Sequence, residues 1–505
     1  MILNLFSSAP EHPLADAKEL KRVVSELTTA NDFRAVDEVL GWLESLEHAE
    51  KFRADKLNEV VRVLDEAVQA HSRRLAREYL TSTRLSKMEE RRYWTTTIDF
   101  SNRLATAYEK ALAASALKDK AADGLKPHLP LIVCRILYSL AVDLKWTYFK
   151  YGPVPQDLWL RLGTAYLAAE KGKYADKSLQ LYPGPHASTT ATQEYLKALV
   201  LQASALDSLL PLDIELAEKL ISHFLPNFVL SAQDRPDNLY SVDPAQGQPP
   251  KRLVKLPQAS PTVRFIAPGK AHAEMLAMIH EIERGEVPPS LVLGGSYSPK
   301  VVLNVLRHVA NYWAEKPPIR AHQRHPVKTR LSVLHGFDDC VTMIGEAPLA
   351  LAEKAESWVV DNVSIGGFGA LVPCQRDEWL RIGALLCVQP EGGDNWLLGV
   401  VRRYGKENDT MAGVGIQTIA KQANVVELRP RGSLSYGVGS GIIGLAYRDS
   451  PDAEDMRLVL PSNTFDVRES LDAEIDGQMT LMSPTELVET GPDYEIARYR
   501  ARIAQ

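Results

Sequence analysis

Two arginines in the C-terminal half of the chain have the type and spacing of an anion-binding pair. Arg320 and Arg324 lie four residues apart, in a stretch from 316 to 330 that holds five Lys or Arg residues and no acidic residue. Each guanidinium presents a planar fork of donors that suits a phosphate or the O6 and N7 atoms of guanine, and its face can stack on a purine. The pair therefore predicts binding of a phosphate or a purine at this point of the chain.

A second polar group follows about 37 residues later, in the hexapeptide Asn-Val-Ser-Ile-Gly-Gly at 362–367. Asn362 offers an amide to a base edge, and Ser364 offers a hydroxyl. Gly366 and Gly367 permit a tight turn and a close approach of the backbone to a ligand. Asp361 precedes this group and is the alternative acid if the register is shifted by one residue.

One further cation, Arg402, lies in a later apolar run. It could add a phosphate contact, and the alternative is an ordinary solvated strand end. The pair His322 and His325 has HxxH spacing, but a metal would need further ligands, and the neighbouring Arg and Lys charges would repel a cation. We expect neither a metal site nor catalytic residues, because no nucleophile–base pair or carboxylate pair stands at a recognisable spacing.

The elements that position these residues are short strands. After residue 318 the hydrophobic period becomes two, in runs rich in Val, Ile, Leu and Thr that Gly, Asp, Asn and Pro separate. This pattern is typical of a small antiparallel barrel or sandwich. The arginine pair precedes the first expected strand, 328–334, and the Asn-Ser-Gly group forms a later strand-to-strand turn.

The rest of the chain divides by composition into a multidomain α+β protein. Residues 1–230 show helical spacing with little Pro or Gly and predict an all-α domain, either a bundle or a repeat-like array. Residues 231–318 begin with a Pro-rich stretch and predict a linker with a small mixed α/β connecting region. The barrel is expected over 319–430, and 431–505 continues the strand pattern as an extension or a second small barrel.

A single segment of the helical part, 159–183, has the spacings of a tetratricopeptide repeat. Trp159, Gly163, Tyr166 and Ala175 fall at the positions where small residues would let two helices approach and aromatic rings would fill the groove. One repeat does not distinguish an array from an irregular bundle. Either arrangement could provide a protein-binding surface.

The two polar groups and the strands around them resemble the PilZ family, whose signature is RxxxR followed by [D/N]xSxxG. The resemblance covers about 110 residues, roughly 320–420, and includes Gly415-Ile416-Gln417 in a late strand. It implies a β-barrel that binds cyclic di-GMP on its surface. Arg320 and Arg324 would grip phosphates and guanine, Asn362 and Ser364 would bond the other guanine, and Gly367 would make room.

Composition excludes several other classes. A net charge of −6 does not suit an electrostatic DNA- or RNA-binding protein. The four cysteines form no CxxC pair, which fits a reducing compartment and argues against a zinc ribbon. The most apolar run, 130–144, contains Arg135 and Asp143, so we expect a buried helix and no membrane insertion.

The sequence therefore predicts a cytoplasmic bacterial second-messenger receptor, and not an enzyme. By resemblance its ligand is cyclic di-GMP, its helical domain binds an unidentified protein partner, and its output lies in motility or biofilm regulation. No other cofactor is expected, and the GGDEF and EAL signatures are absent from the sequence. The alternative is a ligand-independent scaffold in which the barrel is structural.

Overall fold

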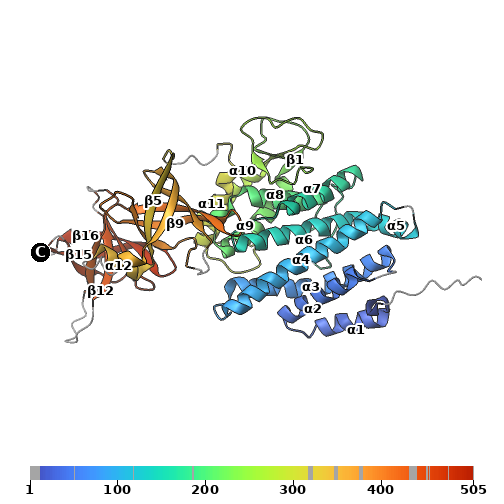
Figure 1. The fold of residues 1–505 in the computed structure, drawn as a ribbon, viewed down its shortest axis with the longest axis horizontal. Helices are drawn as coiled ribbons and strands as arrows, with labels where there is room; N and C mark the ends of the chain where they lie inside the picture. Colours follow the sequence, from blue (N-terminus) through green and yellow to red (C-terminus); the bar gives the residue numbers. More distant parts are fainter. Residues whose placement is uncertain are drawn as a thin grey trace, which may run out of the picture. The chain divides into compact units, whose positions relative to one another are not determined.

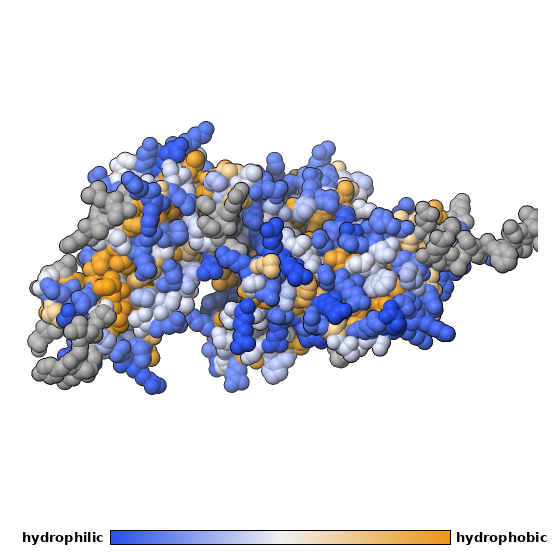
Figure 2. All heavy atoms as spheres, turned by 60° about the horizontal axis from the view of Figure 1, so that its bottom comes forward, coloured by the Kyte–Doolittle hydropathy of each residue, from blue (hydrophilic) through white to orange (hydrophobic). Residues whose placement is uncertain are grey.

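The computed structural model describes residues 12–49, 52–117, 119–184, 187–316, 322–345, 351–374, 379–431, 441–450, 453, 455–475 and 477–503. The chain forms two compact units, residues 1–318 and 319–505. The first is mainly helical and the second consists of antiparallel barrels, as the sequence predicts. On the face drawn in Figure 2, hydrophilic residues cover most of the surface and hydrophobic residues show as separate areas between them.

The helical unit contains eleven α-helices within the described residues. They are α1 (Ala17–Leu27), α2 (Asp32–Glu47), α3 (Ala54–Thr81), α4 (Lys87–Ala114), α5 (Lys120–Leu125), α6 (Leu129–Phe149), α7 (Gln156–Lys171), α8 (Ala191–Ala203), α9 (Pro211–Phe224), α10 (Ala271–Glu283) and α11 (Pro299–Tyr312). Local signals set several starts: the Asn31 side chain accepts from the Arg34 amide at α2, and Ser86 and Glu89 form a capping box at α4. Figure 1 shows α3, α4 and α6 lying side by side as long rods.

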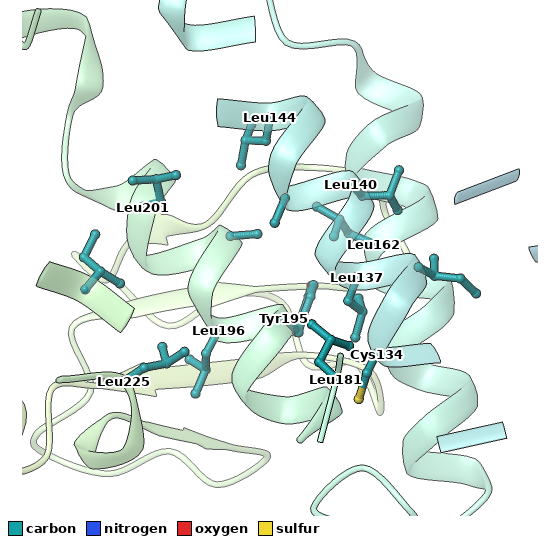
Figure 3. Close-up of a cluster of buried hydrophobic side chains, with 14 of the residues drawn as sticks. Cys134, Leu137, Leu140, Leu144, Leu162, Leu181, Tyr195, Leu196, Leu201 and Leu225 are labelled. Atoms are coloured by element: carbon teal, nitrogen blue, oxygen red, sulfur yellow. The ribbon is translucent and has the colours of Figure 1, made fainter. Parts of the chain in front are cut away.

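Helix α6 is the centre of this unit and packs against α4, α7, α8 and α9. Its side chains Leu137, Leu140 and Leu144 are fully buried, and Figure 3 shows them in one cluster with residues of α7 and α8. The stretch Lys120–Phe149 is long and apolar enough to cross a membrane, yet 67% of its apolar window is buried inside the protein. In this fold α6 is therefore a core helix, as the sequence predicts.

The buried carboxyl of Asp143 on α6 should make the stability of the helical unit depend on pH. Burial raises its pKa to about 6, although Thr147 and Asn102 donate hydrogen bonds to it. An acid with a raised pKa binds more protons in the folded state than in the unfolded state. The free energy of unfolding is therefore higher at low pH and falls by roughly 1–3 kcal/mol as the pH rises from about 4 to about 6.

We expect Asp143→Asn to remove this pH dependence and to raise the unfolding midpoint near neutral pH. Thermal unfolding of the full chain, followed by far-ultraviolet circular dichroism across that pH range, would measure the unfolding midpoint of both proteins at each pH. A variant with the same pH profile as the wild type would contradict the assignment to Asp143.

The repeat-like segment does not form a helical hairpin. Helix α7 buries Trp159, Leu162 and Tyr166, but residues 172–184 and 187–190 contain no helix. Gly163 contacts a loop instead, since a Cβ there would lie 1.9 Å from the Pro244 carbonyl oxygen. The first unit is therefore an irregular bundle.

The stretch predicted as a linker belongs to the helical unit. It forms a small sheet in the order β1-β4-β2-β3, from β1 (Val229–Ser231), β2 (Tyr240–Val242), β3 (Lys251–Arg252) and β4 (Arg264–Ala267). Tyr240, Ile266 and Trp313 join the same hydrophobic core as α1 to α9. Arg252 also donates to the carbonyls of Tyr312, Ala314 and Glu315 at the end of α11. Composition alone did not reveal this packing.

The second unit starts with a closed barrel in the strand order β10-β7-β6-β5-β8-β9. The strands are β5 (His325–His335), β6 (Glu356–Ser364), β7 (Gly367–Pro373), β8 (Leu385–Pro390), β9 (Leu397–Lys406) and β10 (Met411–Ala420). A helix that the alternating pattern did not indicate, α12 (Phe337–Ile344), follows β5. Inward side chains such as Leu331, Trp358 and Val388 fill the barrel, in keeping with the period-two pattern.

The remaining strands close into a second barrel in the order β11-β12-β13-β16-β15-β14. They are β11 (Asn424–Pro430), β12 (Ile442–Tyr447), β13 (Asp455–Pro461), β14 (Leu471–Ile475), β15 (Gln478–Thr490) and β16 (Tyr494–Ile503). The sequence placed 424–430 in the first barrel, but β11 pairs with β12 and β14. The boundary between the barrels therefore lies between 420 and 424.

The two barrels share a hydrophobic core. It joins residues of α12 and the first barrel to residues of the second, namely Leu334, Phe337, Cys340, Met343, Leu351, Leu385, Cys387, Leu398, Val400, Ala420, Leu445, Tyr447, Val459, Tyr494 and Ile496. Asp493 of the second barrel accepts a hydrogen bond of 2.7 Å from the amide of Phe337, the first residue of α12. This long-range cap fixes the start of the helix against the second barrel.

Candidate ligand-binding site

Pairing of β5 with β6 brings the two predicted polar groups together on the first barrel. His325 pairs with Val363, and Pro326 pairs with Asn362, in antiparallel register. Arg324 is half-buried and directly precedes this pairing, so its backbone adjoins the start of the turn at Ser364. Arg320 lies outside the described residues.

The turn itself links β6 to β7 through Ile365 and Gly366, with Ser364 paired to Gly367. The Ser364 hydroxyl donates to the Gly367 carbonyl at 3.4 Å. Gly367 has a φ of 151°, and a Cβ there would lie 1.9 Å from the Ile416 carbonyl oxygen of β10. The space that Gly367 leaves is thus filled by β10, which the resemblance did not indicate.

Asn362 presents an acceptor without a partner. Its Nδ2 donates to Oδ1 of the exposed Asp361 at 2.6 Å, while its own Oδ1 is buried and has no hydrogen-bond partner within the described structure. A buried acceptor without a partner carries a desolvation cost, which an N–H donor that reached it would relieve.

A glycine that the sequence analysis missed accommodates this amide. Gly369 of β7 lies opposite Asn362, and a Cβ there would be 2.3 Å from Nδ2. The Gly-Phe-Gly spacing at 367–369 is the sequence feature from which a second close approach at Gly369 could have been predicted. Asp361 and Asn362, the two candidates for this position of the site, are joined by a hydrogen bond.

Arg402 of β9 is engaged within the protein. Its Nη1 and Nη2 donate to the two carboxylate oxygens of Glu489 on β15 at 2.6 and 2.7 Å, and its Nε donates to Gln417 at 2.7 Å. Burial alone would lower the pKa of Arg402, but the bonds to Glu489 raise it. The side chain links the two barrels, a contact across 87 residues that no local pattern could reveal.

A groove of about 1300 Å³ runs beside the turn, between the two barrels. Its lining includes Ile365, at the tip of the turn, together with Trp396 of the first barrel and Tyr447 and Arg448 of the second. A ligand held on the turn would thus lie near the second barrel. Across the described residues, no group of three or more His, Cys, Asp or Glu side chains could hold a metal ion.

The fold is that of two antiparallel barrels joined in one chain to a helical bundle. Residues 18–236 match the family described as the N-terminal domain of the cyclic-di-GMP receptor FimW. The match lies within the helical unit and does not reach the barrels. No curated protein matches the chain significantly.

Proposed function

We propose that the protein is a cyclic di-GMP receptor whose first barrel is of the PilZ type. The observation that carries this proposal is the β5–β6 pairing, which brings Arg324 and the turn at 362–367 together on one edge of a closed six-stranded barrel. The family match of the helical unit supports the same ligand from a different part of the chain.

In the proposed complex the two polar groups contact different parts of the dinucleotide. Arg324, with Arg320, bonds phosphate and the O6 and N7 atoms of one guanine. Asn362 can turn its amide so that Oδ1, which is buried and unpaired in this structure, accepts from the other guanine. Ser364 can turn its hydroxyl from the Gly367 carbonyl toward the ligand. The protein performs no catalysis in this proposal, and the site is cytoplasmic.

The signal would pass through the peptide that joins the helical unit to the barrel, because the same peptide carries both arginines. Binding changes the arrangement of the two units only if the ligand favours one arrangement over others. The helical unit would then bind or release a protein partner. A partner bound equally with and without nucleotide would instead support the scaffold alternative.

Titration calorimetry with cyclic di-GMP tests the binding site. We expect the wild type to bind and Arg324→Ala to bind about 100-fold more weakly, the equivalent of roughly 2.7 kcal/mol, because a charged contact to phosphate is lost. Arg330→Ala is the matched control: Arg330 lies six residues after Arg324, within β5, is exposed and donates to Ser357. Absence of heat from the wild type would refute the proposal, and a fully active Arg324→Ala would move the site elsewhere.

A further inference from the structure

The imidazole of His322 packs directly on the ligand-binding turn. A Cβ added to Gly366 would lie 2.9 Å from Cδ2 and 3.6 Å from Nε2 of His322. Such a distance leaves no room for a methyl group, so the ring occupies the position above residue 366. His322 comes from the arginine-bearing peptide, two residues before Arg324, and Gly366 comes from the turn.

At position 366 a glycine and an alanine differ in the space that they leave for His322, and not in backbone conformation. The φ of Gly366 lies outside the left-handed region, in contrast to Gly367 with its φ of 151°. An alanine at 366 would keep the backbone and meet only the far end of an exposed, flexible side chain. Its effect should therefore fall on the position of His322 and not on the folding of the barrel.

We propose that the His322–Gly366 contact is a positioning device for the ligand site. The contact joins the arginine-bearing peptide to the turn, and so keeps Arg324 beside Ser364 and Asn362 before the ligand arrives. Both residues stand at positions that the RxxxR and [D/N]xSxxG signatures leave open. The inference rests on the proposed function. In it His322 positions the arginine-bearing peptide and does not itself bind the ligand.

Preorganisation of this kind changes affinity in a predictable way. If the peptide adopts the binding arrangement only about a tenth of the time once the contact is lost, the apparent dissociation constant rises about tenfold. We expect this loss for Gly366→Ala, which displaces the ring, and a similar loss for His322→Ala, which removes it. The double variant should bind no more weakly than either single variant, because both changes abolish one contact.

Calorimetry with cyclic di-GMP on the wild type, both single variants and the double variant measures this coupling, and thermal unfolding of each protein reports folding separately. Gly413→Ala is the control glycine on the same barrel, since its Cβ would meet nothing nearer than 3.6 Å. The expected result is non-additive loss of affinity at an unchanged unfolding midpoint.

Three results would overturn the inference. The first is an affinity of Gly366→Ala equal to or higher than that of the wild type, which would mean that the ligand must displace the ring. The second is addition of the two single losses in the double variant, which would mean that the two changes act separately. Failure of the wild type to bind overturns the proposed function itself, and with it this inference, so the two failures are distinguishable.

Discussion

Arg135→Ala should destabilise the helical unit more than any surface substitution. We expect the free energy of unfolding to fall by about 3–5 kcal/mol. Arg135 is only 1% exposed, and its guanidinium donates to Tyr108, Glu66 and the Leu181 carbonyl. It lies 3.3 Å from the fully buried carboxylate of Asp65. Burial raises the pKa of Asp65 against the opposing charge of Arg135, so removal of the arginine leaves an unpaired buried acid.

Thermal unfolding followed by circular dichroism would measure the loss. Arg22→Ala is the control, because Arg22 also pairs with two carboxylates, Glu19 and Glu26, but on the surface, and should leave the midpoint unchanged. Asp65→Asn in the Arg135→Ala background should recover part of the stability, since the amide carries no charge. Equal midpoints for the Arg135 variant and the wild type would show that the buried network contributes nothing net.

The sequence predicts those features that local pattern determines. Alternating apolar residues and turn glycines indicated the strands of the first barrel, and the spacing of Asn362, Ser364 and Gly367 indicated the turn between β6 and β7. The same signals placed the arginine pair before the first strand and the Asn-Ser-Gly group at a later strand-to-strand turn. Antiparallel pairing of neighbouring strands then brings the groups together without any long-range information.

Long-range contacts account for what the sequence did not predict. Asp493 caps α12 from 156 residues away, Glu489 binds Arg402 across 87 residues, and Arg252 caps the end of α11. None of these pairs has a local signature. The Pro-rich stretch after 231 likewise has the composition of a linker, and only its packing against Trp313 and its neighbours makes it part of the helical unit.

For the helical unit, the sequence predicts the helices but not the family or the function. Helical spacing predicted the all-α character of residues 1–230, and an apolar run predicted the buried helix α6, but many unrelated bundles have the same patterns. The tetratricopeptide-like positions were filled because Trp159 and Tyr166 belong to a buried face, whatever the neighbouring element is. The association of residues 18–236 with a receptor family came from comparison and not from any motif in that segment.

Loss of a single tyrosine in the second barrel should loosen the first barrel as well. Tyr494 has no exposed surface and belongs to the core that both barrels share, together with Leu385 of β8 and Val400 of β9. Its hydroxyl donates to Glu489 at 3.2 Å, the carboxylate that also binds Arg402. Tyr494→Ala therefore removes packing from both sides of the interface, at a cost of about 3–5 kcal/mol.

Hydrogen exchange resolved by peptide would show where that cost falls. We expect faster exchange in β8 and β9 as well as in β12, β13 and β16, because a shared core opens as one cooperative unit. Tyr494→Phe keeps the ring, loses only the hydrogen bond to Glu489, and should cost about 1 kcal/mol. Protection that falls only in the second barrel would mean that the barrels open independently. The cooperative result would mean instead that the turn between β6 and β7 and the second barrel respond as one body. Gln417 of β10 pairs with Gly367 of the turn and accepts from Arg402, which also binds Glu489.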